Sequence, residues 1–207
     1  MSSARTATSK GVVTRWTVDF WLDPACPRTR HTARWVAQIT NDVPLDVRWR
    51  VMSLSVLNEH RDDDPEEDRD GFLWIPARVA TAVQTEHGHD ALGEFYDALW
   101  THPDGTEREW IGDIGEALHR AALPVELAAT GTSDAYDTEL RASHHDGVSL
   151  VDADIGTPVL RITGPDGTQS AFFGPVLDSL PATNEQARLW AAMVFLADVP
   201  SFQEVKA

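Results

Sequence analysis

The fold is decided by a stretch near the start of the chain, Arg15-Trp-Thr-Val-Asp-Phe-Trp-Leu22, which continues as Asp23-Pro-Ala-Cys-Pro-Arg-Thr-Arg30. Polar and apolar residues alternate in its first half, which predicts a β-strand. Asp23-Pro24 ends that strand, and apolar residues at helical spacing predict a helix over residues 27–40. The one cysteine of the chain, Cys26, is therefore expected at a strand-to-helix turn.

The sequence that follows completes a β-α-β unit. Residues 45–52 alternate again and predict a second strand, which normally lies parallel to the first after a right-handed crossover. Strand patterns return at residues 159–162 and 169–174, on either side of the turn sequence Gly164-Pro-Asp-Gly167. An amphipathic helix over residues 184–196 is predicted to end the fold.

The middle of the chain predicts helices only. These helices are expected at residues 77–86, 92–100 and 109–121, and from a capping Thr132 to about His144. The element order predicts an α/β protein, a thioredoxin-like fold with an inserted α-helical domain. We expect residues 12–56 and 147–207 to form the thioredoxin-like domain, and residues 57–146 to form the insertion.

Composition excludes several classes of partner. The chain has 33 acidic and 17 basic residues, a formal net charge of −16. This charge argues against a nucleic-acid binder and against docking on anionic membranes. Residues 1–11 have the character of a disordered tail and lack the apolar run of a secretory signal. With no apolar run of about 18 residues to span a bilayer, we expect a cytoplasmic protein.

Cys26 is the sharpest candidate for chemistry. A single cysteine excludes a disulfide within the chain and a multi-cysteine zinc site. At a helix N-terminus, unpaired N–H groups and the helix dipole favour a thiolate, and Arg28 and Arg30 are expected to act in the same direction. A buried structural cysteine is the alternative, but the turn sequence favours a reactive one.

A second candidate feature precedes the third predicted strand. Gly156-Thr157-Pro158-Val159 has a proline at the strand entry, where thioredoxin-like folds place a cis-proline facing the cysteine. A trans proline in a turn is the commoner state of an X-Pro bond, and only the combination with Cys26 favours cis. No metal is expected, because the adjacent His144 and His145 do not share a helix face.

Several segments resemble one known family. They follow the order of the segments of the DsbA-like mycothiol-dependent nitroreductases of actinobacteria, and the likeness extends from about Trp16 to Phe202. The segments are Val18-Asp-Phe-Trp-Leu-Asp-Pro-Ala-Cys-Pro27, Thr32-Ala-Arg-Trp35, Val51-Met-Ser-Leu-Ser-Val-Leu-Asn-Glu59, Thr132-Ser-Asp-Ala-Tyr-Asp137, Ser143-His-His145, Ile155-Gly-Thr-Pro158 and Ala171-Phe-Phe-Gly-Pro-Val-Leu177. The wider superfamily includes kappa-class glutathione transferases and 2-hydroxychromene-2-carboxylate isomerases. The resemblance implies a thioredoxin fold with a helical insert, a cytoplasmic location, a homodimer and mycothiol as the partner of the cysteine.

The chain departs from that family at its central motif. The family pattern is Cys-Pro-Trp-Cys, whereas this chain has Cys26-Pro27-Arg28-Thr29. The nucleophile is kept, and a threonine takes the place of the resolving cysteine. Cycling between a dithiol and a disulfide within the chain is therefore impossible, which excludes a protein disulfide oxidant of the usual kind.

These observations predict a thiol-dependent oxidoreductase that uses an external small thiol such as mycothiol on a small electrophilic, quinone or nitro substrate. Cys26 would be the nucleophile or hold a bound thiolate, and Thr29 would stabilise the thiolate. Two alternatives stay open: a mycothiol S-transferase or isomerase, and a non-enzymatic binding protein that kept the fold. The expected substrate-binding residues are Trp21, Pro27, Arg28, Arg30, Thr157, Pro158 and, by family likeness only, Asn58.

Overall fold

The computed structural model describes residues 15–63, 65–68, 70–151, 155–199 and 202. The tail expected at residues 1–11 lies outside these residues. Within the described part of the chain, no helix is both long enough and apolar enough to cross a membrane.

A four-stranded sheet forms the centre of the protein, in the order β2-β1-β3-β4. Its strands are β1 (Trp16–Leu22), β2 (Leu45–Val51), β3 (Val159–Thr163) and β4 (Gln169–Phe173). β1 and β2 are parallel, which confirms the expected β-α-β unit. β3 is antiparallel to β1 and forms the expected hairpin with β4.

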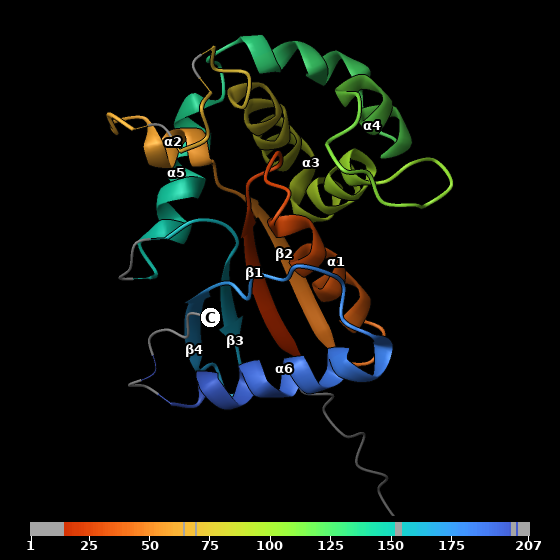
Figure 1. The fold of residues 1–207 in the computed structure, drawn as a ribbon, viewed down its shortest axis with the longest axis vertical. Helices are drawn as coiled ribbons and strands as arrows, with labels where there is room; N and C mark the ends of the chain where they lie inside the picture. The colour runs from red at the N-terminus through yellow and green to blue at the C-terminus, as the bar shows by residue number, and fades with distance from the viewer. Residues whose placement is uncertain (1–14, 64, 69, 152–154, 200–201, 203–207) are drawn as a thin grey trace, which may run out of the picture.

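Two helices share an apolar core with one face of the sheet. They are α1 (Thr29–Ile39) and α6 (Thr183–Ala197), and Figure 1 shows them beside the strands, with α6 running across the end of the sheet. Alternate residues of β1 point into this core, because side chains alternate between the two faces of a strand. The helices also meet directly, since the Trp35 indole N–H donates to the Gln186 carbonyl at 3.2 Å.

The remaining helices lie at the opposite end of the molecule from α6 (Figure 1). They are α2 (Leu54–Asn58), α3 (Trp74–Trp100), α4 (Ile114–Arg120), the 3₁₀-helix η1 (Val125–Thr132) and α5 (Asp137–Val148). The expected domain boundary at 56/57 falls inside α2, and the one at 146/147 falls inside α5. At each predicted boundary the chain therefore passes from one predicted domain to the other within a helix. The division into two domains stays a prediction.

Several predicted helix boundaries were wrong. The helices expected at 77–86 and 92–100 form one element, α3, broken only at Gly88, whose φ of 87° is left-handed. The helix expected from residue 109 begins at Ile114, because the Asp113 carboxylate caps it by accepting the Glu116 N–H at 2.8 Å. α5 begins at Asp137 instead of directly after Thr132, and its N-cap, Tyr136, makes no side-chain capping bond.

The second face of the sheet holds Trp21 beneath α5. Its side chain is 1% exposed, and its indole N–H donates to the Ser143 carbonyl at 2.9 Å. Gly147 of α5 lies so close that a Cβ there would come within 2.6 Å of the indole. The absence of a side chain at residue 147 therefore lets α5 pack against the strand that leads to Cys26.

We predict that Gly147→Val lowers the free energy of unfolding by roughly 2–3 kcal/mol, because an overpacked core must displace side chains that have no free space. Urea denaturation measures the effect. Asp146→Val, on the exposed neighbouring position of the same helix, is the matched control and should change stability by less than about 1 kcal/mol. Equal stability of the two variants would contradict close packing of α5 on Trp21.

Candidate active site

Cys26 lies in the turn between β1 and α1. In Figure 1 this turn is at the end of β1 nearest α3. It is half-buried and carries a free thiol. The turn is closed by two backbone hydrogen bonds: Cys26 N–H donates to the Asp23 carbonyl, and Thr29 N–H donates to the Cys26 carbonyl, both at 3.3 Å. Since α1 begins at Thr29, the sulfur is placed at the start of an 11-residue helix.

Two buried threonine hydroxyls lie beneath this turn. The Thr157 hydroxyl accepts the Asp23 N–H at 3.1 Å and lies 3.1 Å from the Thr29 hydroxyl. The Thr29 hydroxyl in turn hydrogen-bonds the Cys26 sulfur, which lowers the thiol pKa. Because each hydroxyl has one proton, Thr157 donates to Thr29 when Thr29 donates to the sulfur. The hydrogen bonds thus run from the Asp23 N–H through the Thr157 and Thr29 hydroxyls to the sulfur, which accepts the last of them.

The proline beside these hydroxyls has the predicted conformation. The Thr157–Pro158 peptide bond is cis, as expected from its combination with Cys26. Pro158 is buried, and its carbonyl accepts the Gly174 N–H at 2.8 Å. Thr157 and Pro158 therefore lie under the Cys26 turn, although more than 130 residues separate them from it in the chain.

Asp23 is a buried acid that the sequence analysis did not single out. Its carboxylate accepts the Ala25 N–H at 2.8 Å and the Leu54 N–H at 2.7 Å, so it links the Cys26 turn to the start of α2. Burial raises the pKa of Asp23 to about 6, against the effect of these hydrogen bonds, and the nearby charge of Glu66 also raises it. The sequence signal was available, since Asp23 stands three residues before Cys26.

The expected low pKa of the thiol is not found. Burial raises the pKa of Cys26 above its usual value, and the charge of Asp23 raises it further. Hydrogen bonds from the Arg28 N–H, the Thr29 hydroxyl and the Thr29 N–H act in the opposite direction but are smaller. A helix N-terminus lowers a thiol pKa only where its effect exceeds the desolvation of the thiolate.

The two arginines do not act on the sulfur as predicted. The Arg28 side chain is exposed to solvent, as is Pro27. The Arg30 guanidinium turns instead to the loop after α3, where it donates to the carbonyls of Arg108 and Glu109, each at 3.0 Å. It also lies 5.5 Å above the ring of Trp100. Arg30 thus ties α1 to this loop.

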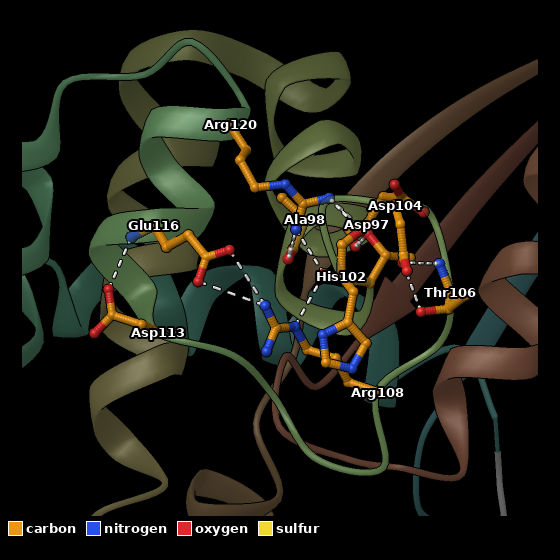
Figure 2. Close-up of polar contacts among 10 residues, drawn as sticks. Asp97, Ala98, His102, Asp104, Thr106, Arg108, Asp113, Glu116 and Arg120 are labelled. Atoms are coloured by element: carbon orange, nitrogen blue, oxygen red, sulfur yellow. Dashed lines mark hydrogen bonds and ion pairs between the residues drawn. The ribbon is translucent and has the colours of Figure 1, made fainter.

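The loop over residues 101–113 is joined to α1 through Arg30. Figure 2 shows how polar side chains hold it: Arg108 reaches the Glu116 carboxylate at 3.3 Å, and Arg120 donates to the Ala98 carbonyl at 3.0 Å. The indole N–H of Trp100, just before the loop, donates to the Pro24 carbonyl at 3.0 Å. The polar network therefore fixes the end of α3 against the residues that lead to Cys26.

Asn58 is the last residue of α2, the helix whose Leu54 N–H is bound by Asp23, and it lines a hollow of about 270 Å³. The hollow is lined by Ser55, Asn58, Glu59, Arg61, Glu66, Asp68 and Trp74. Trp21, by contrast, lies in the core under α5 and presents almost no surface, so its position is that of a packing residue.

The structure thus brings together Cys26, Thr29, Thr157 and Pro158, and Asn58 ends the short helix α2, whose Leu54 is bound by Asp23. Trp21 packs against α5, and the Arg30 guanidinium is bound to the 101–113 loop. Among the residues that the structure describes, no group of three or more His, Cys, Asp or Glu side chains is placed to hold a metal ion.

Solved structures with the same fold include several DsbA-like proteins. The thiol-disulfide exchange protein α-DsbA2 from Wolbachia pipientis is 15% identical, with 91% of this chain and 85% of that chain covered and a TM-score of 0.50. The probable DsbA oxidoreductase SCO1869 from Streptomyces coelicolor is 17% identical, with 93% of each chain covered and a TM-score of 0.50. These likenesses show a DsbA-like thioredoxin fold, as the sequence predicted.

Comparison with related sequences identifies the family to which this chain belongs. The uncharacterized protein Rv2286c of Mycobacterium tuberculosis is 26% identical over 199 residues, which cover 92% of this chain and 81% of that protein. The family model described as "Mycothiol-dependent nitroreductase Rv2466c" matches residues 25–207, which include Cys26, Thr29, Asn58, Thr157 and Pro158. The chain therefore belongs to the Rv2466c-like family.

Proposed function

We propose that this protein is a cytoplasmic thiol-dependent oxidoreductase in which Cys26 acts with an external low-molecular-weight thiol, mycothiol. The observation that carries the proposal is a free cysteine at the start of α1, hydrogen-bonded by Thr29 at the position of a resolving cysteine. The family description supports mycothiol as the thiol. Small electrophilic substrates, quinones or nitro compounds, are the expected electron acceptors.

Thr29, in place of a second cysteine, determines which thiol reactions are possible at Cys26. A hydroxyl donates a hydrogen bond to a thiolate but cannot form a disulfide with it. The Cys26 thiolate first attacks the sulfur of an adduct between the small thiol and the quinone; an S–S bond forms, the sulfur–carbon bond breaks, and its electron pair stays on the hydroquinone. Only a second small thiol can then release Cys26 from this mixed disulfide. In that step the attacking thiolate forms a new S–S bond to the small-thiol sulfur, and the bond to Cys26 breaks with its electron pair on Cys26. In the net reaction two thiols become one disulfide, and a quinone gains two electrons and two protons.

The first prediction concerns the covalent intermediate. Incubation with oxidised mycothiol is expected to add one mycothiol to Cys26, as measured by intact mass. Cys26→Ser should carry no adduct and lose thiol-dependent turnover, because the nucleophilic sulfur is gone. Thr29→Cys is the matched gain-of-function variant: oxidation should remove its two thiol hydrogens by forming an internal disulfide. Full activity of the serine variant would contradict the proposal.

The second prediction concerns the acid beneath the thiol. Asp23→Asn should lower the pKa of Cys26, because it removes a negative charge that opposes the thiolate and keeps one carbonyl oxygen as an acceptor. The rate of alkylation by iodoacetamide at pH 7.5 should rise about three- to tenfold, since a tenfold change corresponds to one pKa unit. Glu109→Gln changes the same charge on the neighbouring loop and should leave the rate unchanged. An unaltered rate in Asp23→Asn would contradict the assigned coupling.

The raised pKa of Cys26 also favours a second candidate function. A mycothiol S-transferase or isomerase would hold the thiolate of an external mycothiol, and Cys26 itself would not need to ionise. Such an enzyme would yield a stable conjugate or a rearranged product with no net redox change, whereas the oxidoreductase yields a reduced product. A non-enzymatic binding protein would bind the thiol without turnover. The proposal includes a homodimer, as the family likeness implies, and light scattering measures the oligomeric state.

A further inference from the structure

The imidazole of His144 binds the backbone at the start of α2. Its side chain lies on α5 and is 8% exposed, and its Nδ1 accepts the Ser53 N–H at 3.4 Å. The preceding residue of α5, Ser143, donates its hydroxyl to the Val51 carbonyl at 2.7 Å. Two successive side chains of α5 therefore hold the short segment that joins β2 to α2.

That segment also carries an N–H group that binds the acid of the Cys26 turn. The Leu54 N–H donates to Oδ2 of Asp23 at 2.7 Å, while Oδ1 of the same carboxylate accepts the Ala25 N–H at 2.8 Å. Two successive N–H groups, those of Ser53 and Leu54, thus have acceptors on two different elements. Because a planar peptide unit joins these two residues, a displacement of Ser53 also moves the Leu54 N–H.

His144 can accept this hydrogen bond because its ring is neutral. Burial lowers the pKa of His144 to about 4; the charge of Glu59 acts against this effect, and the charges of His145 and Arg141 act with it. A neutral imidazole has one proton, and an Nδ1 that accepts a hydrogen bond leaves that proton on Nε2. Protonation of the ring would put a donor opposite the Ser53 N–H and break the bond.

We propose that His144 is a positioning residue that keeps the Leu54 N–H directed at the carboxylate of Asp23. The proposal rests on the proposed function, in which Cys26 is the reactive group. The hydrogen bond from Leu54 lowers the pKa of Asp23 against the larger effect of burial, and the charge of Asp23 raises the pKa of Cys26. Loss of the His144 acceptor should therefore leave more of Asp23 protonated, and more of the thiol ionised, at neutral pH.

The pKa of Asp23 tests this role directly. Its carboxyl carbon can be titrated by NMR in the full chain labelled at aspartate, and Asp23→Asn identifies the resonance by removing it. We expect the midpoint to rise by about 0.5–1 unit in His144→Leu, which has no acceptor, and to stay in place in His144→Asn, whose amide oxygen can replace Nδ1. His145→Leu, at the exposed next position of α5, is the matched control and should leave the midpoint unchanged. An unchanged midpoint in His144→Leu, or an equal shift in His144→Asn, would overturn the proposal.

The reactivity of the thiol gives a second measurement. Iodoacetamide should alkylate Cys26 about two- to threefold faster at pH 7 in His144→Leu than in the wild-type protein, and at the wild-type rate in His145→Leu. In an Asp23→Asn background, His144→Leu should leave the rate unchanged, because the amide has no charge to lose. An increase that persists in that background would show that His144 acts on the thiol without Asp23, and would overturn the proposal.

A third measurement uses the wild-type protein and so does not depend on the folding of a variant. The ring nitrogen resonances of His144 at pH 7 should show the proton on Nε2 and none on Nδ1. A proton on Nδ1 would overturn the proposal, since that nitrogen could not then accept the Ser53 N–H.

None of these measurements uses mycothiol. Absence of a mycothiol adduct on the wild-type protein would refute the proposed function and leave the effect of His144 on Asp23 intact. An adduct on Cys26 together with an unshifted Asp23 midpoint in His144→Leu would refute the role of His144 alone.

Discussion

The carboxylate of Asp23 connects the Cys26 turn to the start of α2. This carboxylate accepts the N–H of Ala25 in its own turn and the N–H of Leu54 at the start of α2. The backbone N–H of Asp23 donates to the Thr157 hydroxyl. The end of β1, the start of α2 and the segment before β3 therefore meet at Asp23. A carboxylate in this position shapes the Cys26 turn, because buried N–H groups need acceptors.

This arrangement has an electrostatic consequence for the thiol. Burial raises the pKa of Asp23 to about 6. Burial of the thiol and the charge of Asp23 raise the pKa of Cys26. The sulfur must then be stabilised by neutral donors: the hydroxyl of Thr29, supported by Thr157, and the N–H groups at the start of α1. Neutral donors stabilise a thiolate less than a nearby cation does, which agrees with the raised pKa of Cys26.

Arg30 illustrates how the fold redirects a residue that the sequence places beside the sulfur. Its guanidinium is planar and has several N–H donors. Two backbone carbonyls of the 101–113 loop and the ring of Trp100 satisfy it better than a single sulfur would. As a result Arg30 joins α1 to the loop after α3. Charge near a cysteine in sequence is therefore a poor guide to charge near its sulfur in space.

The sequence by itself determined the strand-helix-strand start, the place of Cys26 at the turn and the lack of a resolving cysteine. Alternation and helical spacing are local properties, and counting cysteines needs no structure. Only the tertiary structure decided that Thr157 lies under Thr29, that Asp23 is buried and that Trp21 packs under α5. These features depend on contacts between residues tens to more than a hundred positions apart, and pKa values follow from the burial that such contacts create.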